Sequence, residues 1–270
     1  MNEIEKHDVV SLYNLPTEVK FCKKCTISNQ RPRINFDENG ICSACNYASY
    51  KRNKVDWPER EKELIDLCDK YRKNDGSYDV IVPVSGGKDG GFVAHMLKYK
   101  YGMKPLTGTF SPSLYTDIGR QNLDNFIQIG GYDHILGSVN GSVHRNMMKL
   151  AFIHMGENFQ PFAYGQTNFP LKIAVQNNIQ LIMYGENGEL EYGGSLKNKD
   201  KYGQPIEDWD ELYHKGTNTK ELLNEGMKIG LLTQDEIKHP SIKYYSAPNR
   251  DELAKKKIEF VWFGFFNNWI

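Results

Sequence analysis

The stretch between residues 78 and 102 constrains the fold more than any other part of the sequence. The run Tyr78–Val84 is rich in valine and isoleucine, which is typical of a short strand buried in a parallel sheet. It passes directly into the glycine-rich turn SGGKDGG, residues 85–91, and then into a segment with helical periodicity that ends at Gly102. A strand that enters a helix through glycines predicts one unit of a parallel α/β fold.

The same alternation continues along the chain. Strands are predicted at 105–110, 134–137, 179–184 and 258–266, and helices at 117–130, 142–155 and 169–177. Strands that alternate with helices indicate a Rossmann-like parallel sheet covered by helices on both faces. Residues 195–245 are polar and rich in glycine, so we expect a lid-like insertion over the site, helical around 219–229.

The charge balance and the apolar runs exclude several classes of protein. Thirty-four Lys and Arg residues balance 34 Asp and Glu residues, which argues against nucleic-acid binding as the main function. The apolar run at 258–266 is far shorter than the roughly 20 residues of a spanning helix, and the amino terminus lacks an apolar signal core. We expect a cytoplasmic protein whose apolar carboxyl terminus is covered by a partner or by further sequence.

Four of the five cysteines form two close pairs. Cys22 and Cys25 are separated by two residues, as are Cys42 and Cys45, with sixteen residues between the pairs. Such knuckles can gather four thiolates around one Zn²⁺ ion, and because no coordination position stays open, the expected role is structural. An iron–sulfur cluster is the alternative. A module of some 30 residues buries too little apolar area to fold without the metal.

These features divide the chain into four parts. The predicted parts are a polar extension at 1–19, a zinc-binding module at 20–50, a connecting helix at 51–76 and the α/β domain at 77–270. In the connecting helix, Asp56 suits the N-cap and Pro58 the first turn. The fifth cysteine, Cys68, lies on the apolar stripe of this helix.

The turn after the first strand carries groups that bind phosphate. Gly86 and Gly87 allow the backbone to turn sharply and present successive N–H groups, which form an anion cradle with the start of the following helix. Ser85 adds a hydroxyl, Lys88 a cation, and Asp89 a carboxylate that can hold Mg²⁺. The spacing matches neither the Walker loop nor the G-x-G-x-x-G fingerprint.

The sequence SGGKDG resembles the SGGxDS signature of the PP-loop ATP pyrophosphatases, which have an adenine nucleotide alpha hydrolase-like fold. This resemblance implies that ATP binds, that a substrate oxygen attacks the α-phosphorus, and that the loop holds the departing pyrophosphate. Gly90 stands where the signature usually has serine. One hydroxyl contact to phosphate must therefore come from elsewhere.

Further segments extend the resemblance over residues 22–194. The CxxC pairs, then YTDIGRQNLDNFIQIG, FAYGQTNFP and YGENGELEYGG, together resemble the N-acetyl sugar amidotransferases of bacterial surface-polysaccharide synthesis, which serve the O-antigen of lipopolysaccharide. The resemblance implies an enzyme that uses ATP to adenylylate the acetamido oxygen of a sugar carried on a nucleotide. Ammonia then replaces that oxygen and gives an acetamidino sugar.

The resemblance also assigns roles to the ends of the strands. Residues 85–90 would bind the β and γ phosphates of ATP, with Lys88 neutralising developing charge and Asp89 binding Mg²⁺. Thr109 and Phe110 end the second strand and would line the adenosine pocket, because ligands bind at the carboxyl ends of parallel strands.

Residues after the fourth strand reach the same edge of the sheet. Glu186 would be an acid–base group or a second Mg²⁺ ligand, and Glu189 and Glu191 fit either that role or a solvated surface. Side chains that suit a sugar offer hydroxyls, amides or a ring face, and these are Tyr164, Gln166, Asn168, Asn187, Glu191 and Tyr192.

The source of ammonia lies outside this chain. A glutaminase needs a nucleophilic cysteine with a histidine, but four cysteines are assigned to metal and Cys68 to an apolar stripe. We expect a separate glutaminase subunit, which delivers ammonia together with a HisF-like partner.

Two other functions compete with this one. The first is a tRNA-thiolating enzyme, which shares the loop and the zinc knuckles but needs a sulfur carrier and a basic surface. The second is a zinc-knuckle adaptor whose loop only senses ATP.

Overall fold

The structure is a computed structural model that describes residues 8–268 except 13, 206–207, 209–211, 213 and 215–216. Its centre is a five-stranded sheet of order β3-β2-β1-β4-β5, in which every pairing is parallel. The strands are β1 (Val80–Pro83), β2 (Pro105–Phe110), β3 (His134–Gly137), β4 (Leu181–Tyr184) and β5 (Glu259–Trp262). This order confirms the predicted Rossmann-like parallel sheet.

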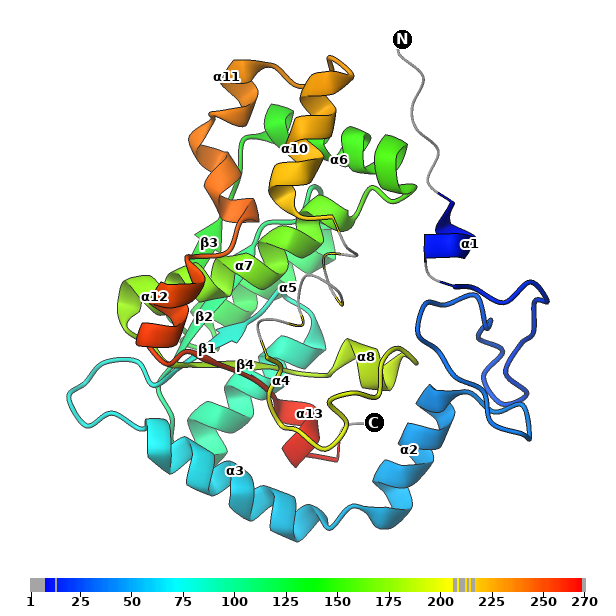
Figure 1. Ribbon diagram of the computed structural model, residues 1–270. Coiled ribbons are helices and arrows are strands. Elements are labelled where there is room, and N and C mark those ends of the chain that lie inside the picture. Colours follow the sequence, from blue (N-terminus) through cyan, green and yellow to red (C-terminus); the bar gives the residue numbers. More distant parts are fainter. Residues whose placement is uncertain are drawn as a thin grey trace.

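Helices cover both faces of the sheet (Figure 1). One face packs against α3 (Trp57–Tyr71), α4 (Lys88–His95), α5 (Asp117–Gln128) and α13 (Phe263–Phe266). The other is covered by α6 (Gly141–Met155), α7 (Gln160–Asn177) and α12 (Arg250–Lys255), and α10 (Thr219–Lys228) packs on α6. Side chains alternate between the two cores, because Val80 and Val82 enter one and Ile81 the other. A short π-helix, Met96–Lys100, continues α4.

The direction of winding reverses between β1 and β4. From β1 the chain runs outward to β2 and β3 through α4 and α5, and it then crosses the other face through α6 and α7 to reach β4. The loops that leave β1 and β4 therefore diverge at adjacent strand ends. In open α/β sheets this switch point is where ligands bind.

Two predicted elements differ from the observed ones. The predicted strand 258–266 is β5 followed by the one-turn helix α13, because the pairing with β4 ends at Tyr184 and Trp262. The predicted helix 169–177 begins at residue 160 and passes through Pro170, which leaves the carbonyl of Gln166 without its helical donor. The hydroxyl of Tyr184 donates to that oxygen at 2.6 Å.

The amino-terminal region contains α1 (Val9–Leu12), a cysteine-bearing segment and α2 (Ser43–Lys54), which leads into α3. The predicted boundary between residues 50 and 51 falls inside α2. At the start of α3, the side chain of Asp56 accepts a hydrogen bond from the N–H of Glu59, with Pro58 in the first turn, as the sequence predicts. Residues 1–7 and 13 of the predicted extension lie outside the described residues.

Within the described part of segment 195–245, residues 202–204 lie along β5, and residues 219–245 pack on α6 and α7. The segment forms α10, α11 (Gln234–Ile237) and a 3₁₀ helix at Pro240–Tyr245. Leu222, Leu232 and Tyr245 enter the core on that face. The helix predicted around 219–229 is therefore present. Several positions between 206 and 216, and positions 269–270 at the apolar end, lie outside the described residues. In the part that the structure describes, no helix has the length and apolarity needed to cross a bilayer.

Candidate functional site

The turn after β1 is open to solvent and has available donors. Gly86 has a φ of +85°, and a Cβ there would lie 2.7 Å from the carbonyl oxygen of Gly119, so the turn requires glycine. Among the described residues, the N–H groups of Ser85, Gly86 and Gly87 find no hydrogen-bond acceptor. Ser85 and Gly87 are exposed. These donors can bind an anion at the start of α4.

Gly90, where the PP-loop signature has serine, is held tightly in this chain. A Cβ at this position would lie 2.5 Å from the carbonyl oxygen of Pro83 and 3.0 Å from the Cα of Val84. The first turn of α4 therefore packs against the end of β1 too closely for any side chain. The departure from the signature follows from this approach of helix and strand.

The loop after β4 leads into the short helix α8 (Gly188–Glu191). The Asn187 side chain caps this helix, because its oxygen accepts from the N–H groups of Glu189 at 3.0 Å and Leu190 at 3.4 Å. Asn187 is thus bound to its own helix, and it is not among the residues that line the cavity beside it.

A cavity of about 290 Å³ lies at the switch point. The β1 side contributes Lys88 and Asp89, and the β4 side contributes Glu186, Glu191 and Tyr192. Residues almost 100 positions apart therefore meet where the two loops diverge, as the topology predicts. A larger, mainly apolar cavity of about 540 Å³, formed by 200–205, α12 and β5, shares none of these side chains.

Both basic and acidic side chains line this cavity. The ammonium of Lys88 lies 2.6 Å from the Asp89 carboxylate, which raises the pKa of Lys88. Burial raises the pKa of Glu191, although the neighbouring Lys51 ammonium opposes that shift. The hydroxyl of Tyr192 lies 3.5 Å from a Glu186 oxygen. Asp89 and Glu186 thus offer carboxylate oxygens, the ligands that Mg²⁺ prefers, to one space.

Several predicted ligand-binding residues lie in the interior. Thr109 donates its hydroxyl to the carbonyl oxygen of Val84, and the ring of Phe110 packs under α7 at Gly165, where a Cβ would lie 2.2 Å from it. Neither residue borders the cavity at the switch point. They fix the end of β2 beside the turn.

The FAYGQTNFP segment also serves packing. Tyr164 is fully buried and donates to the carbonyl oxygen of Thr217, and the buried Asn168 donates to the carbonyl oxygen of Tyr245 at 2.8 Å. Gln166 is exposed on α7, away from the cavity lining. The structure therefore brings Lys88, Asp89, Glu186, Glu191 and Tyr192 together and leaves these three side chains elsewhere.

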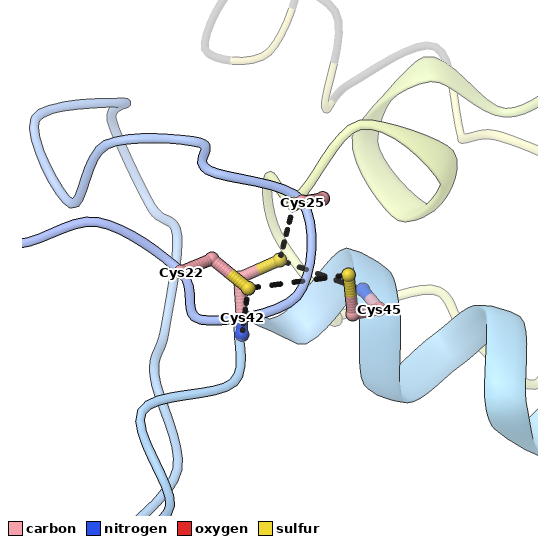
Figure 2. A group of neighbouring side chains, drawn as sticks. All are labelled: Cys22, Cys25, Cys42 and Cys45. Carbon is pink, nitrogen blue, oxygen red and sulfur yellow. Dashed lines mark hydrogen bonds between the residues drawn. The ribbon is translucent and has the colours of Figure 1, made fainter.

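The four paired cysteines form one compact cluster (Figure 2). Their sulfur atoms all lie within 4.8 Å of one another, with Cys25 and Cys42 at 3.6 Å and Cys22 and Cys45 at 4.0 Å. Four sulfurs around one Zn²⁺ ion at the usual bond length are about 3.8 Å apart. The cluster therefore has the size of a single-ion site, and the fold class with a four-cysteine module that could hold zinc is confirmed.

Backbone donors support the thiolate form of one ligand. Burial acts to raise the pKa of Cys22, but N–H groups, including those of Cys42 at 3.3 Å and Lys24 at 3.4 Å, outweigh it and lower the pKa to about 6. A thiolate is the form that binds metal.

Two ion pairs attach this module to α8. The guanidinium of Arg33 lies 2.9 Å from one Glu189 oxygen and 3.1 Å from the other, and the ammonium of Lys51 lies 2.7 Å from both oxygens of Glu191. In Figure 1, α8 lies beside the amino-terminal module. These contacts explain two of the three glutamates in YGENGELEYGG.

The two glycines that end the YGENGELEYGG motif also belong to the contact between the amino-terminal module and α8, which we call the joint. Gly193 has a φ of +81° and faces Ile34, and a Cβ at Gly194 would lie 2.1 Å from the Glu189 carboxylate. The sequence pattern does not single out Arg33, Lys51 or Arg52. The one sequence feature that could have indicated Lys51 and Arg52 is that they form a basic pair, with five residues between them and the second CxxC.

The fifth cysteine is not available for chemistry. Cys68 is fully buried on α3, and burial raises its pKa to about 12. Such a thiol is a poor nucleophile, because the thiolate is the reactive form.

Comparisons with known proteins give a limited result. No family model matches the sequence, and no curated protein matches it. Among solved structures, the chain is similar to the NH3-dependent NAD synthetase of Campylobacter jejuni subsp. jejuni NCTC 11168, with 16% identity, a TM-score of 0.37, and coverage of 75% of this chain and 95% of that one. It is also similar to the NMN synthetase of Francisella tularensis, with 14% identity, a TM-score of 0.37, and coverage of 76% and 97%. Similarity at this level assigns no substrate to the chain.

Proposed function

We propose that this chain is an ATP-dependent, AMP-forming amidotransferase of the PP-loop type that acts on an N-acetyl sugar. One observation carries the proposal: the open turn after β1 and the carboxylates of Asp89 and Glu186 meet at the switch point of a parallel sheet. This arrangement suits a magnesium-bound polyphosphate, because backbone donors and Lys88 face its negative charge while carboxylates can hold the ion.

The reaction solves a leaving-group problem. The oxygen of an acetamido group does not leave when ammonia attacks, so the oxygen first attacks the α-phosphorus of ATP. The new bond joins that oxygen to phosphorus, the α–β bond breaks, and pyrophosphate departs. Ammonia then adds to the imidate carbon, and AMP leaves with the original oxygen. Such a reaction depends mainly on positioning and on compensation of charge.

Each residue of the site has a part in this sequence. The N–H groups of 85–87 would hold the departing pyrophosphate, and the exposed ammonium of Lys88 would offset its charge. Asp89 and Glu186 would hold Mg²⁺, which when bound neutralises phosphate oxygens. Tyr192, which is half exposed beside Glu186, offers a hydroxyl and a ring face to a sugar.

The sugar substrate rests on the combined motifs of residues 22–194. Their resemblance to N-acetyl sugar amidotransferases is the ground for choosing an acetamido group over other amides. Within the site, the phenolic hydroxyl of Tyr192 can donate to or accept from a sugar hydroxyl.

Ammonia is supplied by another protein in this proposal. Since Cys68 is buried and the other cysteines are gathered in one cluster, the chain has no thiol suited to a glutaminase or to sulfur transfer. We expect a separate glutaminase subunit with a HisF-like partner. Free ammonium should support the reaction of the single chain, and glutamine alone should not.

The direct test uses the zinc-loaded chain with ATP, Mg²⁺, ammonium and a panel of nucleotide-linked N-acetyl sugars. We expect AMP and pyrophosphate to form with one sugar, whose mass falls by about one unit as oxygen is exchanged for NH. Asp89→Asn should reduce AMP formation by about three orders of magnitude, because it removes a Mg²⁺ ligand. The control Asp69→Asn, on an exposed part of α3, should leave the rate unchanged. Sugar-dependent AMP formation that survives in Asp89→Asn contradicts the assignment.

A further inference from the structure

One wall of the switch-point cavity comes from residues 20–54, which are the zinc module together with the whole of α2. Ala48, Lys51 and Arg52 of α2 line it together with Lys88 and Asp89. Positions 48, 51 and 52 lie on one side of a helix, so α2 presents a continuous strip to the cavity. The turn after β1 therefore supplies only part of this enclosure.

Two of the basic side chains around the cavity form ion pairs, and a third does not. Lys88 pairs with Asp89, and Lys51 pairs with Glu191. Arg52 forms no ion pair and no hydrogen bond with any residue that the structure describes. It is an arginine that faces a cavity with all of its donors available, beside a Lys88 that is largely exposed.

The neighbouring lysine anchors the helix that carries this arginine. Lys51 is 4% exposed, and its ammonium lies 2.7 Å from both oxygens of Glu191 and 5.4 Å from the centre of the Tyr47 ring. This buried ammonium contacts both carboxylate oxygens and so holds α2 against α8. The helix that carries Arg52 is therefore anchored beside the cavity.

We infer that Arg52 binds the polyphosphate of the nucleotide, so that the zinc module completes the phosphate site. The guanidinium has a planar set of donors that matches two phosphate oxygens at once. Arg52 and Lys88 line the same cavity, and the N–H groups of residues 85–87 come directly before Lys88 in the turn after β1, so the anion would be bound by groups from both elements. This inference rests on the proposed function, because it assigns the ligand of the same site.

The test measures binding of magnesium pyrophosphate to the full, zinc-loaded chain by calorimetry. In Arg52→Ala the Kd should rise at least tenfold, and in Arg52→Lys by a smaller factor, since one cation remains but the paired contacts are lost. The matched control is Lys54→Ala on the same helix, which is exposed and does not line the cavity. Its Kd should stay within twofold of the unaltered chain, and all variants should keep one zinc.

The outcomes separate this inference from the proposed function. Pyrophosphate binding that weakens in Arg52→Ala, in a chain that forms no AMP with any sugar, supports the phosphate contact while the amidotransferase assignment fails. An Arg52→Ala variant that binds within twofold of the unaltered chain overturns the inference. A chain that binds neither pyrophosphate nor ATP overturns it as well.

Discussion

The zinc module and the α/β domain reach stability by different means. In the α/β domain, two cores of buried aliphatic and aromatic side chains enclose the sheet. In residues 20–54, the buried side chains are Cys22, Cys42, Ser43 and Lys51, so no aliphatic or aromatic side chain is buried. The four clustered cysteines, which could hold zinc, and two ion pairs take the place of a core in this module. We therefore expect its docked position, on which one wall of the site depends, to require the metal.

The largest expected effect comes from removing zinc. Structural zinc contributes about 10–16 kcal/mol to the folding of small modules, so the chelated chain should lose the order of residues 20–54. Arg52 and Lys51 would then leave the site, and AMP formation should fall about 100-fold. The cooperative unfolding transition of the sheet, followed by circular dichroism, should remain because its cores do not include the module.

Two cysteine variants provide matched forms of the same experiment. Cys42→Ser should lose zinc and reproduce the effect of chelation, whereas Cys68→Ala should keep zinc and destabilise the sheet, because Cys68 is fully buried on α3. Full activity in a zinc-free chain would show that the two regions are independent.

A smaller effect is expected at the phosphate loop itself. Gly90→Ser restores the PP-loop signature, yet its Cβ would lie 2.5 Å from the Pro83 carbonyl oxygen. The variant should lower the free energy of unfolding of the α/β domain by about 1–3 kcal/mol, measured with urea. Gly91→Ser is the control, since its nearest neighbour is a ring atom of Phe126 at 3.7 Å. Equal stability of the two variants would show that the loop can move away from β1.

How far the sequence predicts this molecule depends on the range of the interactions. The strands, the glycine turn and the cysteine pairs are local patterns, and their positions follow from periodicity and spacing. The meeting of Asp89 with Glu186 also follows, because strand ends converge in a parallel sheet. Tyr164 and Asn168 illustrate the limit, since a polar side chain in a motif can bind a ligand or satisfy a buried carbonyl.

The joint between the regions could not be predicted for the same reason. Glu189 and Glu191 look like site carboxylates in sequence, but their partners, Arg33 and Lys51, lie 156 and 140 residues away. No local pattern links such positions. Arg33 also adopts a φ of +67°, which a residue other than glycine tolerates only when its surroundings hold the backbone in that conformation.

The joint can be measured as a coupling energy. Because the Glu189 side chain is 9% exposed and that of Arg33 is 25% exposed, a double-mutant cycle with Arg33→Ala and Glu189→Ala should give a coupling of about 1–2 kcal/mol. The exposed pair Glu59 and Lys62 on α3 should give less than about 0.5 kcal/mol in the same cycle. Equal couplings would mean that the module is not anchored by charge.

The smallest effect concerns the pH dependence of the α/β domain. The Thr107 hydroxyl donates to the carbonyl oxygen of Asp133 and so accepts from Nδ1 of His134 at 2.9 Å. The buried Nε2 of His134 is then unprotonated, and it has no hydrogen-bond partner among the described residues. Burial, and then the charge of Arg120, lower the pKa of His134 to about 4. The unfolded chain therefore takes up a proton near pH 6.5 that the folded chain refuses until about pH 4, and stability must fall as the pH drops through this window.

The size of this loss follows from the window and from partial exposure of the ring. Between pH 7 and pH 5 we expect the free energy of unfolding to fall by roughly 1 kcal/mol more in the unaltered chain than in His134→Gln, which cannot titrate. Comparing the two chains at each pH cancels the acid sensitivity of the zinc thiolates, because both chains carry the same module. Parallel pH profiles would show that the imidazole gains a proton acceptor in the folded chain, and that His134 does not contribute to the acid sensitivity of the protein.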